Sequence, residues 1–81
     1  MNPREQLVRR QALRALDACR PWMMGEELLR DAVNIVLMPS VPQAELRRAL
    51  DSLEADCFIR RFGFGREVKI KITDEGRAEI A

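Results

Sequence analysis

Residues 40–76 read SVPQAELRRALDSLEADCFIRRFGFGREVKIKITDEG, and the hydrophobic period of this stretch changes midway. In its first half the apolar residues recur at helical spacing, which predicts a helix over residues 42–56. The buried face of that helix consists of Leu46, Ala49, Leu50 and Leu53. In the second half, residues 68–72 alternate between apolar and basic side chains, as in a strand with one buried face. With Phe58-Ile59 before a glycine turn at residues 63–65, the pattern predicts a β-hairpin after the helix.

The start of this helix carries a capping pattern. Ser40 and Gln43 stand three residues apart, so we expect the Ser40 hydroxyl to accept from the Gln43 amide in a capping box. Pro42 suits the first turn, where its missing N–H costs nothing. On the exposed side, Asp51 falls within reach of Arg47 or Arg48, and we expect an ion pair there.

Two further helices precede this stretch. Apolar residues at positions 8, 12, 15, 16 and 19 predict a helix that follows Asn2 as its cap and ends before Pro21. Glu26 and Glu27 open a second helix, and its apolar positions continue to Leu37. Residues 22–24 between the helices have the composition of a brief strand, and residues 73–76 open a last short turn from which residues 78 and 80 pack back.

The resulting order is helix, short strand or loop, helix, helix, strand, strand. Three short helices leave one side of their core open, and the apolar face of the hairpin can cover it. We therefore expect an α+β fold, a three-helix winged helix-turn-helix with a short C-terminal two-stranded wing. At 81 residues, we expect the chain to be a single winged-helix domain over residues 1–81.

The residues also show a resemblance to a known family. Residues 44–61, AELRRALDSLEADCFIRR, resemble the recognition helix and first wing strand of bacterial winged-helix regulators such as the MarR, ArsR and PadR groups. Residues 72–77, ITDEGR, resemble the Leu-Thr-x-x-Gly-Arg ending of their wing. The whole chain is most similar to small winged-helix proteins encoded in Mu-like prophages. This resemblance implies a winged-helix fold and a role as a transcriptional regulator or phage-type accessory protein.

One position departs from the family pattern. Those proteins have glycine after the third helix, in the left-handed conformation that closes it, and this chain has Cys57. A cysteine in the same dihedrals costs on the order of 1 kcal/mol. The alternatives are that Asp56 takes the left-handed position or that the helix runs on slightly.

Composition excludes several classes of function. No apolar run approaches the roughly 18 residues of a membrane span, and Met1–Pro3 leads into charged residues, so we expect a cytoplasmic protein without membrane contact. With no histidine and only Cys19 and Cys57, we expect no metal site, and we expect both cysteines to be buried reduced thiols. No set of residues supplies a nucleophile with its base, so we expect no enzyme, no cofactor and no small-molecule substrate.

The charge distribution points to a partner. The net charge is +1, but residues 57–73 carry five basic side chains against Glu67, and residues 1–20 carry five arginines against two acids. We expect double-stranded DNA as the partner, because a winged helix places its third helix in the major groove and its wing along the backbone. The third helix itself is net acidic. The expected contacts are Gln43, Arg47, Arg48, Arg60, Arg61, Arg66, Lys69 and Lys71.

The alternative is a winged helix that serves protein contacts or assembly without binding DNA. Residues 35–38, IVLM, hold more apolar surface than one helix face can bury, which favours this alternative. We expect Trp22 to form a lid over the core, and for Phe64 contact with a partner and packing on the hairpin stay open. If the chain forms a homodimer, we expect the surface to lie on the first helix, at Leu7 and Leu13.

Overall fold

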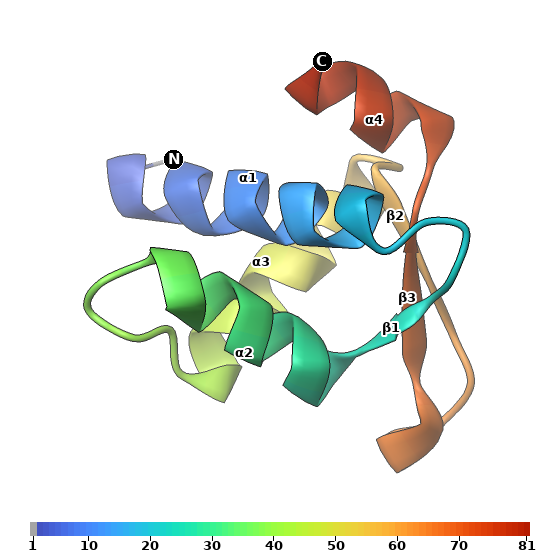
Figure 1. Cartoon of the computed structure of the whole chain (residues 1–81), viewed down its shortest axis with the longest axis horizontal. Helices are drawn as coiled ribbons and strands as arrows, with labels where there is room; N and C mark the ends of the chain where they lie inside the picture. The colour runs from blue at the N-terminus through green and yellow to red at the C-terminus, as the bar shows by residue number, and fades with distance from the viewer. Residues whose placement is uncertain (1) are drawn as a thin grey trace.

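A computed structural model describes residues 2–81, with the side chain of Arg66 left out. Within this range the chain forms α1 (Pro3–Ala18), β1 (Met24–Gly25), α2 (Glu26–Val36), α3 (Gln43–Ala55), β2 (Ile59–Phe62), β3 (Lys69–Ile72) and α4 (Asp74–Ile80). A single 3₁₀ turn over Gly65–Glu67 joins β2 to β3. Figure 1 shows the three long helices packed together, with the sheet at one side and α4 beside α1. The predicted α+β winged-helix architecture is confirmed.

Each of the three long helices contributes side chains to the hydrophobic core, as the spacing of the apolar residues predicted. Helix α1 buries one stripe, α2 buries Leu29 and Val33, and α3 buries the four residues expected of it. The inner face of the hairpin closes the open side of the helices with Ile59, Ile70 and Ile72. Leu13 is 2% exposed, so its predicted place on a dimer surface is wrong, whereas Leu7 is exposed. The core stripe of α1 takes in Leu13 because it lies next to Ala12 and three residues before Leu16, which are both buried.

The sheet has three strands in the order β1-β3-β2, all antiparallel. Met24 and Gly25 pair with Ile70 and Lys69, which confirms a brief strand before the second helix. Directly opposed residues share a face. The register therefore places Lys69 and Lys71 on the outer face of the sheet, together with Arg60 and Phe62.

The predicted capping box at Ser40 is wrong. The cap of α3 is Pro42, whose carbonyl accepts from the Leu46 amide, and no side chain caps this helix end. Val41 is buried, and its amide donates to the Asn34 Oδ1 at 2.7 Å. Pro42 keeps extended dihedrals, with a ψ of 160°, so the helix begins only after it.

The end of α3 resolves the question of Cys57. Cys57 itself has a φ of 65°, and Asp56 keeps ordinary dihedrals as the helix cap. The Phe58 amide donates to the Leu53 carbonyl at 2.9 Å, and the Cys57 amide donates to the Glu54 carbonyl at 3.0 Å. These two hydrogen bonds are the pair that defines a Schellman motif, and the motif needs a left-handed residue directly after the helix cap. Cys57 thus adopts the left-handed conformation that the resemblance implies for a glycine at this position.

Replacing Cys57 by glycine is therefore expected to stabilise the fold by about 1 kcal/mol, because glycine adopts this φ without a clash at Cβ. Thermal unfolding followed by circular dichroism should show the midpoint rise by roughly 4–8 °C for a domain of this size. Cys57→Ala is the control, since it removes the thiol and keeps Cβ. An equal rise in both variants would show that the thiol, and not the backbone conformation, sets the stability.

The surface corrects three further predictions. Trp22 is 76% exposed and forms no lid, because Met24, two residues later, is the residue that packs against the core. Cys19 is half-buried and Cys57 exposed, so both are free thiols but neither is buried. The last segment forms the helix α4 instead of a short turn, and of its two expected packing residues Ile80 lies against the core and Ala78 is exposed. No helix over residues 2–81 has the length and apolar character to cross a membrane.

Candidate nucleic-acid interface

The exposed side of α3 carries the residues predicted to read a partner. Gln43, Arg47 and Arg48 are all exposed, and they lie along the N-terminal half of the helix. Arg47 does not pair with Asp51. Its Nε donates to the Glu26 Oε1 at 3.0 Å, at the start of α2. Glu26 therefore neutralises part of the positive charge that we predicted for this face of α3.

Arg61 is held against α3 instead of projecting from the wing. Its Nη2 lies 2.7 Å from the Asp51 Oδ1 and 2.7 Å from the Glu54 Oε1, and its Nε donates to the same Glu54 oxygen at 3.0 Å. Glu54 Oε2 also accepts from the Arg61 backbone amide at 3.3 Å. The predicted pairing of Asp51 with Arg47 or Arg48 is wrong, because Arg61 faces inward from β2 and reaches Asp51 first.

The electrostatics of this cluster keep Arg61 charged. Burial of the guanidinium lowers the pKa of Arg61, but the hydrogen bonds and charges of Glu54 and Asp51 outweigh burial and raise that pKa above its ordinary value. The cluster ties the wing to the third helix and satisfies a backbone amide that an edge strand would otherwise expose. Arg61 is thus a positioning residue for the wing.

A groove of about 360 Å³ lies between the start of α2, α3 and the wing. Its polar lining alternates in sign, with Arg47 and Arg61 against Glu26 and Asp51. Gly63 and Gly65, both at positive φ, form its outer rim at the hairpin turn. A side chain at Gly63 would collide with the Glu67 carbonyl at 2.8 Å, so this turn requires glycine. The rim is consequently bare backbone that a ligand can approach closely.

The other predicted contacts lie outside the lining of this groove. Arg48 borders a hollow between α1 and α3 together with Arg4 and Arg9. The outer face of the sheet carries the remaining described wing cations, Arg60, Lys69 and Lys71. The side chain of Arg66 lies outside the described part of the chain. The seven predicted residues whose side chains the structure describes therefore do not form one patch.

The arginines of α1 add little free charge to the α3 face. Arg4 lies 3.0 Å from the Glu45 Oε1 and also donates to the Pro39 carbonyl at 2.8 Å. Arg9 lies 2.8 Å from the Asp56 Oδ2 and donates to the Ser52 hydroxyl. These contacts fasten α1 to both ends of α3, so they have a structural role.

The sequence reasoning missed the two acids that organise this face. Glu26 is read from the sequence as a helix-start residue, whose basic neighbour at helical spacing is Arg30 of the same helix, and Glu54 as a solvated one without such a neighbour. Their partners come from other elements, across 21 residues for Glu26 and seven for Glu54. Only the tertiary fold brings these charges together.

Among known proteins, one solved structure supports this fold. The crystal structure of a MarR-family transcriptional regulator from Silicibacter pomeroyi is similar, with a TM-score of 0.75 and 29% sequence identity over 91% of this chain. The chain spans 46% of the length of that regulator. No protein-family model and no curated protein matches the sequence. The chain is thus a winged helix-turn-helix protein, similar in sequence and structure to part of a MarR-family regulator.

Proposed function

We propose that the chain is a winged-helix DNA-binding protein that contacts duplex DNA with α3 and the tip of its wing. The observation that carries this proposal is the groove face, where the exposed half of α3 with Arg47 adjoins a bare glycine turn. The similar structure, a MarR-family transcriptional regulator, supports a regulatory role. A cytoplasmic location, a homodimer and a phage-type accessory role stay predictions.

The proposed contacts follow from the chemistry of each group. An α3 seated in the major groove presents Gln43 and Arg48 to base edges, where glutamine pairs with adenine and arginine with guanine. The glycine turn lies beside the same groove, so the hairpin tip approaches the neighbouring phosphates with its backbone amides. Arg47 joins the interface when a phosphate displaces Glu26 from it.

Fluorescence anisotropy with a labelled duplex tests the proposal. We expect salt-dependent binding, in which each phosphate contact adds about −0.9 to the slope of log K against log salt. Arg48→Ala is expected to weaken binding about fivefold, since one charged contact is lost. The matched control is Arg14→Ala, which removes an exposed arginine from α1. Absence of binding at low salt, or an equal loss in both variants, would refute the proposal.

A protein-interaction role is the second candidate, and the exposed apolar residues of α2 favour it. Ile35 is 85% exposed and Met38 is 83% exposed, with Leu28 and Val36 exposed beside them on the same helix and its end. Side chains this apolar are unusual in a cluster unless a partner covers them. Sedimentation velocity at several concentrations tests it. Association that Met38→Glu abolishes supports an assembly role, and a monomer at every concentration rules out self-association.

A further inference from the structure

The outer face of the sheet is a second charged surface, and it points away from the groove. Ile59, Ile70 and Ile72 face the core, and Arg61 on the same side of β2 reaches α3. The opposite side of the sheet therefore faces away from α3. A duplex seated on α3 leaves the outer face of the sheet free. The side chains of that face are therefore available to a different ligand.

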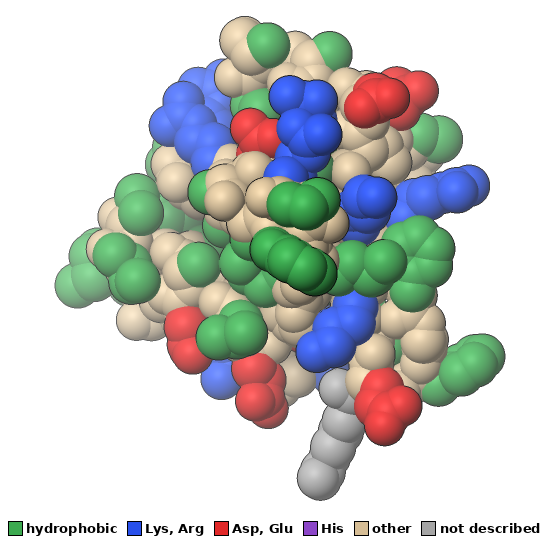
Figure 2. Space-filling model, turned by 45° about the vertical axis from the view of Figure 1, so that its right-hand side comes forward, with side chains coloured by type: hydrophobic (Ala, Val, Ile, Leu, Met, Phe, Trp, Pro, Cys, Tyr) green, Lys and Arg blue, Asp and Glu red, His purple; other side chains and the backbone are tan. Residues whose placement is uncertain are grey.

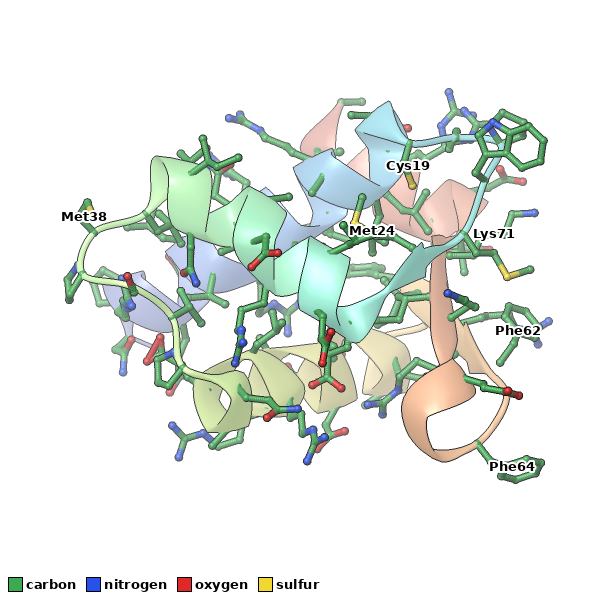
Figure 3. The ribbon with its side chains drawn as sticks, turned by 60° about the horizontal axis from the view of Figure 1, so that its bottom comes forward. Cys19, Met24, Met38, Phe62, Phe64 and Lys71 are labelled. Carbon is green, nitrogen blue, oxygen red and sulfur yellow. The ribbon has the colours of Figure 1, made fainter. Side chains whose placement is uncertain are left out.

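The register arranges this face in two cross-strand rows. One row runs from Gly25 through Lys69 to Phe62, and the next pairs Lys71 with Arg60. The Lys69 ammonium lies across the space above Gly25, since a Cβ built there would be 3.5 Å from the Lys69 Nζ. Figure 3 shows Phe62 and Lys71 both pointing away from the helices, with Phe64 at the tip.

The strand-paired positions of this face carry only positive charge, while the hollow beside Arg60 also takes in Glu54, Asp74 and Glu75. Those paired positions are three cations, one aromatic residue and one glycine, without an acid. Among the described side chains, Arg60, Lys69 and Lys71 take no part in an ion pair, in contrast to Arg4, Arg9, Arg47 and Arg61. The three cations are therefore available to an anionic ligand.

Large flat side chains stand at the margins of these cations. Phe62 is 42% exposed on β2, and Trp22 is 76% exposed in the segment that leads into β1. Because β1 runs antiparallel to β3, that segment approaches from the Lys71 end. Figure 2, with the sheet side turned forward, shows Lys and Arg side chains next to hydrophobic ones. Cations with one exposed aromatic ring on the same face, and a second in the segment that leads into β1, match a chain of phosphates with bases that stack.

We propose that the outer face of the sheet binds single-stranded nucleic acid, with Arg60, Lys69 and Lys71 on phosphates and with Phe62 and Trp22 stacked on bases. A flexible single strand can follow a face this small, and its unpaired bases expose the planes that aromatic side chains need. A duplex hides those planes inside its stack. The proposal is independent of duplex binding by α3.

Trp22 makes the test direct, because it is the only tryptophan of the chain. Titration with a twelve-nucleotide oligothymidine is expected to quench its fluorescence. Three phosphate contacts predict a slope of log K against log salt of about −2, and Lys69→Ala/Lys71→Ala should reduce that slope by about 1.4. Phe62→Ala should weaken binding at least about fivefold, as the loss of one stacked base predicts.

Two comparisons make the result decisive. Arg14→Ala/Arg30→Ala removes two cations from the helices and should leave the oligothymidine affinity within about twofold, whereas Arg48→Ala should affect only the duplex. Absence of quenching, or an equal loss in the two double variants, would overturn the proposal. A glutamate-rich peptide that binds as tightly as the oligonucleotide would also overturn it, in favour of an acidic protein partner.

Discussion

Replacing Gly76 by alanine is expected to destabilise the fold by about 2–3 kcal/mol, which is typical of severe overpacking. A Cβ at this position would lie 2.2 Å from the Phe58 carbonyl oxygen and 2.9 Å from the Ile72 Cγ1. The first of these atoms is backbone, so no rotamer change relieves the clash. A chain of 81 residues has only about 4–12 kcal/mol of stability, so the loss is a large part of it.

The backbone cannot move away because the same atoms are hydrogen-bonded. The Phe58 carbonyl accepts from the Thr73 amide at 3.0 Å, and the Thr73 hydroxyl donates to the Cys57 carbonyl at 2.7 Å. That hydroxyl also accepts from the Gly76 amide at 3.0 Å and so caps α4. The end of α3, the end of β3 and the start of α4 therefore meet at Gly76. This contact explains the Thr-x-x-Gly part of the wing ending in physical terms.

Urea unfolding followed by circular dichroism measures the effect, and Glu79→Ala in the same helix is the control. Glu79 is exposed, so its replacement should change the free energy of unfolding by no more than about 0.5 kcal/mol. If Gly76→Ala proved as mild as Glu79→Ala, the close packing of α4 against the end of α3 would be wrong.

The elements of this fold were predictable where local patterning decides them. Helical spacing predicted α1, α2 and α3, and strict alternation over residues 68–72 predicted β3, because each element buries one face in a single core. The start of α3 was not predictable from Ser40 and Gln43. Val41 is buried with its amide bound to Asn34 of α2, and Pro42 keeps extended dihedrals, so the helix begins after Pro42.

The candidate site was less predictable than the fold. Sequence reasoning placed Arg47, Arg48 and Arg61 together as DNA contacts, and the structure joins only Arg47 and Arg61, in one groove. Which arginines are neutralised depends on acids from other elements, and local spacing does not show these. The sequence also did not show that Arg61 lies on the inner face of the hairpin and the other described wing cations on its outer face. That division depends on which residues of β2 oppose those of β3.

The acids in the groove are expected to weaken the affinity for duplex DNA. Glu26 and Asp51 line the surface where the proposed duplex lies, and Glu26 also holds Arg47. Glu26→Gln/Asp51→Asn is expected to tighten duplex binding about tenfold at low salt. Each carboxylate at about 7 Å from a phosphate in water costs about 0.6 kcal/mol, so the two together account for nearly a factor of ten.

The fold should tolerate this double change. Glu54 retains both of its bonds to the Arg61 side chain, so the wing stays tied to α3. The lost pairs are exposed on at least one side and contribute no more than about 1 kcal/mol each. The gain in affinity should shrink at physiological salt, where the screening length falls to about 8 Å.

A second double variant separates local from global charge. Asp31→Asn/Glu79→Gln changes the net charge by the same amount at exposed positions outside the groove lining. Anisotropy titrations at two salt concentrations should show the tenfold gain for the groove pair and less than about a twofold gain for the distant pair. Equal gains would mean that DNA responds to the total charge of the protein, and α3 would then lose its place as the docking element. A gain confined to the groove pair means that the carboxylates of Glu26 and Asp51 repel the phosphates of a bound duplex and so weaken its binding.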